Sequence, residues 1–252
     1  PGLFPYSFST AKLPDWPIAQ AAYFACDAGT PIGPQTALAA TAAAGCALQA
    51  AEAVASGEYN LAYALCRPPG HHATRARYGG FYYFNNAALA AGRLASLGRV
   101  AVLDIDYHHG NGTQEITYRS DRVMYVSIHG DPNDSYPFFY GYAEERGEGA
   151  GQGYNLNLPL SRGSGLAAYI PALQRGLAAI ADKDCRALVV SAGFDTCQGD
   201  PLGGFALQPE DFQPVGEAIA SLGLPTVVVQ EGGYVVDLLG RCAQALVAGL
   251  RD

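Results

Sequence analysis

The chain has 252 residues, and its 15 Lys and Arg against 23 Asp and Glu give a formal net charge of −8 at pH 7. With 49% hydrophobic and only 15% charged residues, it is too apolar for a disordered protein, and it is long enough to bury a full core. The acidic balance argues against a nucleic-acid partner, because binding phosphates requires clustered Lys and Arg. It is compatible with a cationic small molecule or a lysine-rich peptide.

We expect neither a membrane span nor a secretory signal. No run of 18 uninterrupted apolar residues occurs, and the first ten residues lack the charged and apolar regions of a signal peptide. We therefore expect a cytoplasmic protein with a single domain over residues 1–252 and reduced, mostly buried thiols. The six cysteines, none of them in a C-x-x-C pair, are Cys26, Cys46, Cys66, Cys185, Cys197 and Cys242.

Predicted helices and strands alternate along most of the chain. The first 33 residues contain five prolines and are expected to be irregular. An Ala-rich helix follows from Pro34 and stops near Gly57. The later strands are expected at 60–66, 99–104, 123–128, 187–192 and 225–230, and the helices at 85–97, 166–180, 209–222 and 235–250. This alternation, with Val-rich strands, predicts an α/β fold whose central, mostly parallel sheet carries helices on both faces. The segment 130–153 is a long loop, a feature that is often functional.

Polar residues follow two of the predicted strands at the point where each strand ends. His71 and His72 come after the first strand, and Asp104, Asp106 and His108 come at and after the second. Open α/β sheets bind ligands beyond the carboxyl ends of their strands. Because residues i, i+2 and i+4 of an extended chain point the same way, the D-x-D-x-H side chains can face one site.

Asp195, after a third strand, completes a set of carboxylates and an imidazole that would bind a divalent cation and activate a water. Zinc usually takes more nitrogen and sulfur ligands, so Fe²⁺, Mn²⁺ and Co²⁺ fit this set as well. Asp200 leaves a two-metal site open as an alternative.

Six segments, in order along the chain, resemble the histone deacetylase superfamily. They are RPPGHHA, GGFYYFNNAALAA, VAVLDIDYHHGNGTQE, VSIHGDP, SAGFDTCQGDPLGGF and QEGGY. The sequence is most similar to the bacterial acetylpolyamine amidohydrolases and the class II-type deacetylases, from about residue 23 onward. The resemblance implies an arginase/deacetylase-like α/β fold with one catalytic Zn²⁺, and hydrolysis of an acetylated amine to acetate and free amine.

The resemblance implies a role for each residue that matches a family motif. Asp106, His108 and Asp195 would be the zinc ligands. His72 would be the general base and then the general acid, while His71 would act electrostatically or as a proton partner.

Three further positions match the family's catalytic machinery. Asp104 would orient His71. Asn111 lies where many class I members carry Asp beside the second histidine, and a neutral partner stabilises imidazolium less than a carboxylate does. Tyr234 would donate a hydrogen bond to the substrate carbonyl.

The family's substrate tunnel and monovalent cation site also have counterparts here. Gly80 and Phe81 match one tunnel wall, Tyr136 is expected as the opposite wall, and Leu202 lies at the tunnel mouth. The residues matching a K⁺ site are Asp104, Asp106, His108, Ser127 and Ile128. The remaining histidines, His109 and His129, are expected to be structural.

We expect an N-acetylated amine as substrate, with acetylpolyamine first and acetyl-lysine in a peptide second, and no nucleic acid or membrane as partner. Glu144, Glu145 and Glu148 form an acidic loop that is either solvated or attracts a cationic polyamine. The resemblance is compatible with a homodimer. Only 22 residues precede the segment YFACDAGTPIG, fewer than in the family, so parts of the tunnel rim are expected to be missing.

Two alternatives remain open. A two-manganese ureohydrolase on the same fold would need additional carboxylate ligands and would not need Tyr234. A catalytically inactive ligand-binding or sensor domain would leave the site without turnover.

Overall fold

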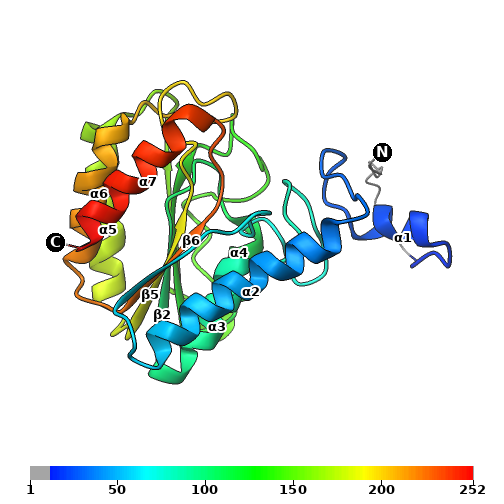
Figure 1. Cartoon of the computed structure of the whole chain (residues 1–252), viewed down its shortest axis with the longest axis horizontal. Helices are drawn as coiled ribbons and strands as arrows, with labels where there is room; N and C mark the ends of the chain where they lie inside the picture. Colours follow the sequence, from blue (N-terminus) through cyan, green and yellow to red (C-terminus); the bar gives the residue numbers. More distant parts are fainter. Residues whose placement is uncertain (1–11, 252) are drawn as a thin grey trace.

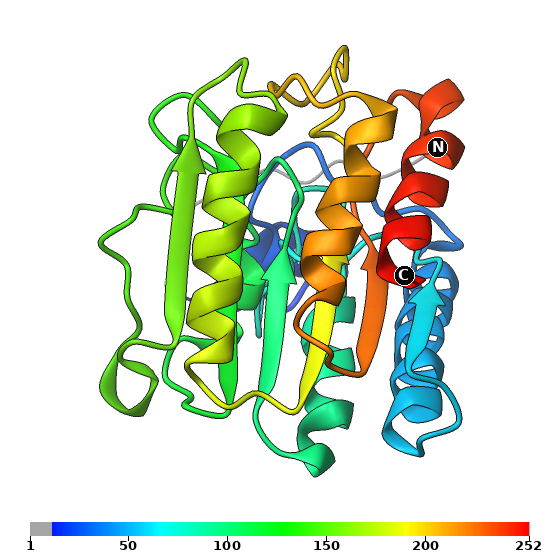
Figure 2. The same ribbon diagram turned by 90° about the vertical axis from the view of Figure 1, so that its left-hand side faces the viewer.

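The computed structural model describes residues 12–251, which fold around one six-stranded sheet. The strand order is β1-β6-β5-β2-β3-β4, and each neighbouring pair is parallel. The strands are β1 (Leu61–Ala64), β2 (Val100–Asp104), β3 (Val123–Gly130), β4 (Asn155–Leu160), β5 (Ala187–Ala192) and β6 (Thr226–Gln230). All strands therefore end at the same edge of the sheet, as Figure 2 shows.

Helices cover both faces of the sheet, which confirms the predicted three-layer α/β architecture (Figures 1 and 2). One face packs against α5 (Leu166–Ala181), α6 (Phe212–Ala220) and α7 (Val236–Arg251), and the other against α2 (Thr36–Ala55) and α3 (Asn86–Leu94). The central strands β2 and β5 are buried along their whole length, as strands covered on both faces must be. Short 3₁₀ turns lie at Ala95–Leu97, Gly149–Gly151 and Pro209–Asp211.

Three elements differ from the sequence-based prediction. The helix α1 (Pro17–Phe24) interrupts the stretch that was expected to be irregular, because Pro17 occupies the first helical turn, where its missing N–H costs no hydrogen bond. The short helix α4 (Asn111–Thr117) forms directly after the histidine loop. The edge strand β4 was also missed, since its sequence NLNLPL carries Asn and Pro, which are depleted in strands.

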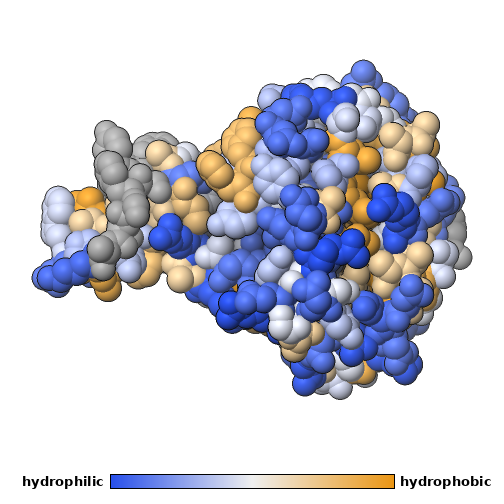
Figure 3. Space-filling model, turned by 180° about the vertical axis from the view of Figure 1, so that it is seen from behind, coloured by the Kyte–Doolittle hydropathy of each residue, from blue (hydrophilic) through white to orange (hydrophobic). Residues whose placement is uncertain are grey.

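Helix α2 is long and apolar enough that its length and composition alone would fit a membrane span. It also packs one Ala-rich face, including Ala43, Ala47 and Ala51, against the sheet and α3. At its N-terminal end, the segment that carries α1 extends away from the sheet (Figure 1). Apolar side chains gather on this projecting end and on parts of a mainly hydrophilic body (Figure 3). The exposed apolar side chains of the projecting segment include Trp16 and Ile18.

Candidate active site

The predicted site residues meet at the carboxyl edge of the sheet. His71 and His72 follow β1, Asp106 and His108 follow β2, and Asp195 follows β5. All five are buried. The parallel arrangement brings the ends of the strands together, so segments that are far apart in the sequence converge there.

Asp106, His108 and Asp195 each offer one ligand atom, and these atoms lie within 4.8 Å of one another. Nδ1 of His108 is 2.9 Å from Oδ2 of Asp195 and 3.3 Å from Oδ1 of Asp106. Two carboxylates and one imidazole are hard-to-borderline donors, and three protein ligands with an open position are typical of catalytic divalent metal sites. The donor set therefore fits a divalent cation.

The electrostatics of this cluster favour a cation. Asp106 and Asp195 are both fully buried, and burial together with the negative charge of Asp106 raises the pKa of Asp195 to about 7. Two carboxylates in one buried site repel each other unless a proton or a cation lies between them. A divalent ion would relieve that repulsion, and the field that raises the pKa of Asp195 would then contribute to binding the ion.

The surrounding residues prepare the ligands for this role. Nε2 of His108 donates to the carbonyl of Leu202 at 3.2 Å, which leaves the lone pair of Nδ1 for a metal. The N–H of Gly232 donates to Oδ2 of Asp106 at 2.9 Å. A Cβ at position 232 would lie 2.7 Å from Asp195 and 2.8 Å from Asp106, so only glycine lets the backbone approach both carboxylates.

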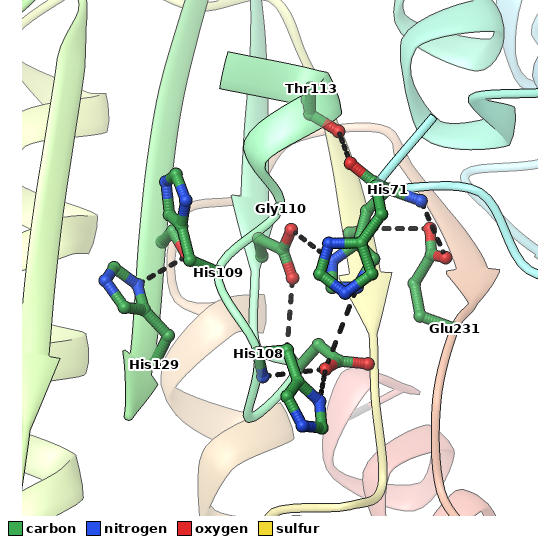
Figure 4. Close-up of polar contacts among 12 residues, drawn as sticks. His71, His108, His109, Gly110, Thr113, His129 and Glu231 are labelled. Atoms are coloured by element: carbon green, nitrogen blue, oxygen red, sulfur yellow. Dashed lines mark hydrogen bonds and ion pairs between the residues drawn. The ribbon is translucent and has the colours of Figure 1, made fainter. Parts of the chain in front are cut away.

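His71 is held in place by two carboxylates. Its Nδ1 donates to Oδ2 of Asp104 at 2.9 Å, and its backbone N–H donates to Oε2 of Glu231 at 3.1 Å, a contact visible in Figure 4. Burial opposes a charged imidazole, but Asp104 and Asp106 outweigh it and raise the pKa of His71 to about 10. Glu231, which also accepts from Gly70 and Ser191, was not singled out from the sequence.

His72 lies beside His71 but has a different environment. Its Nδ1 donates to Oδ1 of Asn111 at 2.7 Å, which fixes the tautomer in which Nε2 carries the lone pair. Burial and then the charges of His71 and His108 lower the pKa of His72 well below its ordinary value. A neutral imidazole with a free Nε2 can accept a proton. Tyr82, also missed from the sequence, packs its ring against both histidines, with centroids 5.0 and 4.8 Å away.

Tyr234 follows β6 and is half-buried beside the cluster. Its ring lies 6.3 Å from that of Phe81, edge to face. Burial and the carboxylates of Asp106 and Asp195 raise the pKa of the Tyr234 phenol, so the hydroxyl stays protonated and can donate a hydrogen bond.

A cavity of about 530 Å³ opens above these groups. Phe81 and Tyr136, which were predicted as tunnel walls, both line it, and so does Leu202, which is 45% exposed. The Tyr136 ring packs edge-on against His72 at 5.0 Å. Gly80 turns the first wall with a φ of 63°, and a Cβ there would collide with the His72 ring at 2.5 Å.

Asp27 links the two walls and was missed from the sequence. Its Oδ2 accepts the N–H of Gly80 and the hydroxyl of Tyr136, and its Oδ1 accepts the hydroxyl of Thr30 at 2.9 Å. One carboxylate thus holds both sides of the cavity. The segment YFACDAGTPIG contains this Asp, but nothing in its spacing indicates which backbone N–H it would accept.

Other predicted residues lie outside the cavity. Ser127 and Ile128 are buried on β3, and Ser127 pairs in register with Asp104. His109 and His129 are buried with ring centroids 4.7 Å apart, and Figure 4 shows them together, apart from His71 and Glu231. Neither histidine lines the cavity.

The acidic loop does not line the cavity either. Glu145 accepts from Gln114 and from the backbone of Gly141, at 2.8 Å each, while Glu148 pairs with Arg119 at 3.0 Å. Two of the three acidic side chains thus stabilise the loop itself. A second cavity, of about 640 Å³, lies on this side and contains none of the predicted metal ligands.

Within residues 12–251, Asp106, His108 and Asp195 form the only such three-ligand cluster. Asp104 is engaged by His71 and by the Tyr125 hydroxyl. Asp200 accepts four backbone N–H groups. Neither carboxylate belongs to the three-ligand cluster.

Comparison with known proteins agrees with this geometry. Residues 8–250 match the family model of the histone deacetylase domain. An acetylpolyamine amidohydrolase of Pseudomonas aeruginosa is 45% identical over 98% of this chain and 73% of that protein, and one of Burkholderia pseudomallei is 48% identical over 92% and 68%. The crystal structure of acetylpolyamine aminohydrolase from Burkholderia pseudomallei matches with a TM-score of 0.94 at 44% identity, covering 98% of this chain and 73% of that one. The chain belongs to the histone deacetylase family and has its α/β fold.

Proposed function

We propose that the protein hydrolyses the acetyl amide of an N-acetylated polyamine, with one divalent cation, zinc, held by Asp106, His108 and Asp195. The convergence of these three ligand atoms within 4.8 Å carries the proposal, together with the cavity that His108 lines with His72 and Tyr234. The chemistry that a divalent cation supplies in such a site is polarisation of a carbonyl oxygen and acidification of water.

The chain's own residues supply the proton transfers. Nε2 of His72 would accept the proton of the attacking water as its oxygen bonds to the acetyl carbon. The same nitrogen would return that proton to the amide nitrogen as the C–N bond breaks, giving acetate and a free amine. His71, held by Asp104, adds positive charge beside the developing oxyanion.

Tyr234 would donate its hydroxyl to that oxyanion, since its raised pKa keeps the proton in place. Removing one such donor typically costs about 10²–10³ in kcat. Tyr234→Phe should therefore lose that much activity while keeping its metal.

The cavity suits a slender cationic chain. Phe81 and Tyr136 contribute aromatic rings to the cavity lining, and such rings would pack against methylene groups. Asp27 and Asp134 also line the cavity, and the chain carries a net charge of −8, which attracts an ammonium group. Relatives that are 45% and 48% identical are acetylpolyamine amidohydrolases.

The test compares kcat/KM for N-acetylputrescine with that for an acetyl-lysine peptide, after reconstitution with Zn²⁺, Fe²⁺, Mn²⁺ or Co²⁺. Preference for the acetylpolyamine with one Zn²⁺ per chain supports the proposal. A strong preference for the peptide would assign the protein to acetyl-lysine instead, and two ions per chain would favour a two-metal hydrolase. Equal, negligible turnover of both substrates would leave a binding domain as the better interpretation.

A further inference from the structure

Asp200 accepts four backbone N–H groups from two separate loops. Oδ1 accepts from Leu202 at 2.9 Å and from Gly203 at 3.0 Å. Oδ2 accepts from Tyr234 at 2.6 Å and from Val235 at 3.2 Å. The residue is only 8% exposed, so these N–H groups, rather than water, are its main partners.

Both loops reach the active site. The first carries Leu202, whose carbonyl accepts from Nε2 of His108 at 3.2 Å. The second carries Tyr234 and leads directly into α7, which begins at Val236. A negative charge is favourable at that point because the helix N-terminus presents free N–H groups and the positive end of its dipole.

The chain before Tyr234 is held at Gly232, whose N–H donates to Asp106 and whose carbonyl accepts from the N–H of Phe194. Two glycines precede Tyr234, and Gly233 adopts a φ of 133°, a conformation that other residues rarely adopt. Beyond Gly232, a tyrosine that follows Gly233 would sample several positions unless its own backbone were anchored. The bond from its N–H to Asp200 is the direct anchor that the structure shows.

We propose that Asp200 is a positioning residue that fixes the backbone of Tyr234, and through it the hydroxyl that would donate to the substrate carbonyl. The inference rests on the proposed amide hydrolysis and adds a residue to it. Asp200 also joins the Tyr234 loop to the Leu202 loop, so the oxyanion donor and the partner of His108 keep a constant separation.

Asp200→Asn tests this role with almost no change in shape. The amide has one accepting oxygen, so its NH₂ group must face one of the two N–H pairs. At least two of the four hydrogen bonds are then lost. We expect kcat to fall by about 10–100-fold, because a misplaced catalytic group can cost that much, while KM stays within about twofold and the metal content is unchanged.

A double-mutant cycle with Tyr234→Phe separates positioning from a general structural role. If Asp200 acts through the Tyr234 hydroxyl, Asp200→Asn should cost less than about twofold in the Tyr234→Phe background. Asp211→Asn is the matched control, because Asp211 also accepts a backbone N–H, that of Gln208 at 2.8 Å, but does not line the cavity. We expect it to stay within about twofold of the wild type.

Amide hydrogen exchange gives a readout that does not depend on activity. A peptide covering residues 231–239 should exchange at least about tenfold faster in Asp200→Asn than in the wild type or in Asp211→Asn. Unchanged exchange, an equal loss of kcat in both tyrosine backgrounds, or loss of the metal would each overturn the proposal. If Asp200→Asn does not fold, the same double-mutant cycle is measured with Asp200→Glu, which keeps the charge and displaces the carboxylate oxygens. The same outcomes then support or overturn the proposal.

The substrate assignment can fail separately. The double-mutant cycle is therefore run with both an acetylpolyamine and a fluorogenic acetyl-lysine amide, which distinguishes a wrong substrate from a wrong role for Asp200. Turnover of the lysine amide alone would refute the proposed substrate, and the coupling between Asp200 and Tyr234 would still be measured on that amide.

Discussion

Nδ1 of His72 donates to the side-chain oxygen of Asn111 at 2.7 Å, whereas the neighbouring His71 donates to a carboxylate, that of Asp104, at 2.9 Å. The two adjacent imidazoles therefore have opposite electrostatics. The pKa of His71 is raised to about 10, and the pKa of His72 is lowered by burial and by the charges of His71 and His108. Environments that separate two pKa values in this way support the proposed role of His72 as the proton acceptor.

Asn111→Asp should reverse part of this difference. A carboxylate at hydrogen-bond distance raises the pKa of an imidazole by about 1–3 units. Since His72 must be neutral to accept a proton, the acid limb of kcat/KM should move to higher pH, and activity at pH 6 relative to pH 8 should fall. The pH profile of kcat/KM checks this, with the exposed Asn133→Asp as the control that adds the same charge elsewhere. An unshifted acid limb would show that His72 is not the group that titrates.

Asp195→Asn should separate the stability of the apoprotein from the affinity for metal. Because the negative charge of Asp106 and burial raise the pKa of Asp195 to about 7, the metal-free pair is repulsive at pH 8. Neutralising Asp195 should stabilise the apoprotein at pH 8 by up to about 4 kcal/mol, because the pKa lies about three units above its unfolded value. It should also abolish the further stabilisation that added Zn²⁺ gives the wild type. Urea unfolding with EDTA and with Zn²⁺ measures both effects. Full metal-induced stabilisation of the variant would remove Asp195 from the ligand set.

Asp27→Ala should loosen both walls of the cavity without touching the metal ligands. The N–H of Gly80 and the hydroxyl of Tyr136 lose their common acceptor. We expect KM to rise by about tenfold and kcat to change by less than about threefold, because substrate binding is affected more than the chemical step. Steady-state kinetics test the split, and Tyr136→Phe, which removes only one of these contacts, should have a smaller effect. A loss confined to kcat would contradict a role in holding the walls.

His129 should make folding stability depend on pH. Burial lowers its pKa to about 4, against about 6.5 in an unfolded chain. The unfolded state thus binds more protons between these values, so the stabilisation is complete above about pH 6.5 and is lost as the pH falls toward 4. Between pH 7.5 and pH 5 the loss amounts to about 2 kcal/mol.

His129→Gln should remove this term, since glutamine can keep contacts with the Ser127 hydroxyl and the Gly141 carbonyl but does not titrate. Urea unfolding of both proteins at pH 7.5 and pH 5 isolates the difference, because the other titrating groups are common to both. Equal losses in the two proteins would show that His129 does not carry the pH dependence.

Local sequence determined most of the elements of this fold. The strand at Val100–Asp104, which is apolar up to its last residue, and the Ala-rich helix at Thr36–Ala55 follow from hydrophobic pattern and propensity, which act within a few residues. The edge strand β4 was not predicted, because its Asn and Pro residues have low strand propensity. It forms because Tyr125–Gly130 of β3 supplies a pairing edge.

The D-x-D-x-H motif and the tandem histidines were likewise recognisable from the sequence, since each motif lies on one short segment. Only the tertiary structure decided what lies opposite them. Asp195 reaches His108 across 87 residues, and Asp27, Asp200 and Glu231 accept backbone N–H groups of distant loops. Because almost every residue carries a backbone N–H, a sequence shows that a carboxylate is present but not which donors it will accept; that choice is made when the strand ends are brought together.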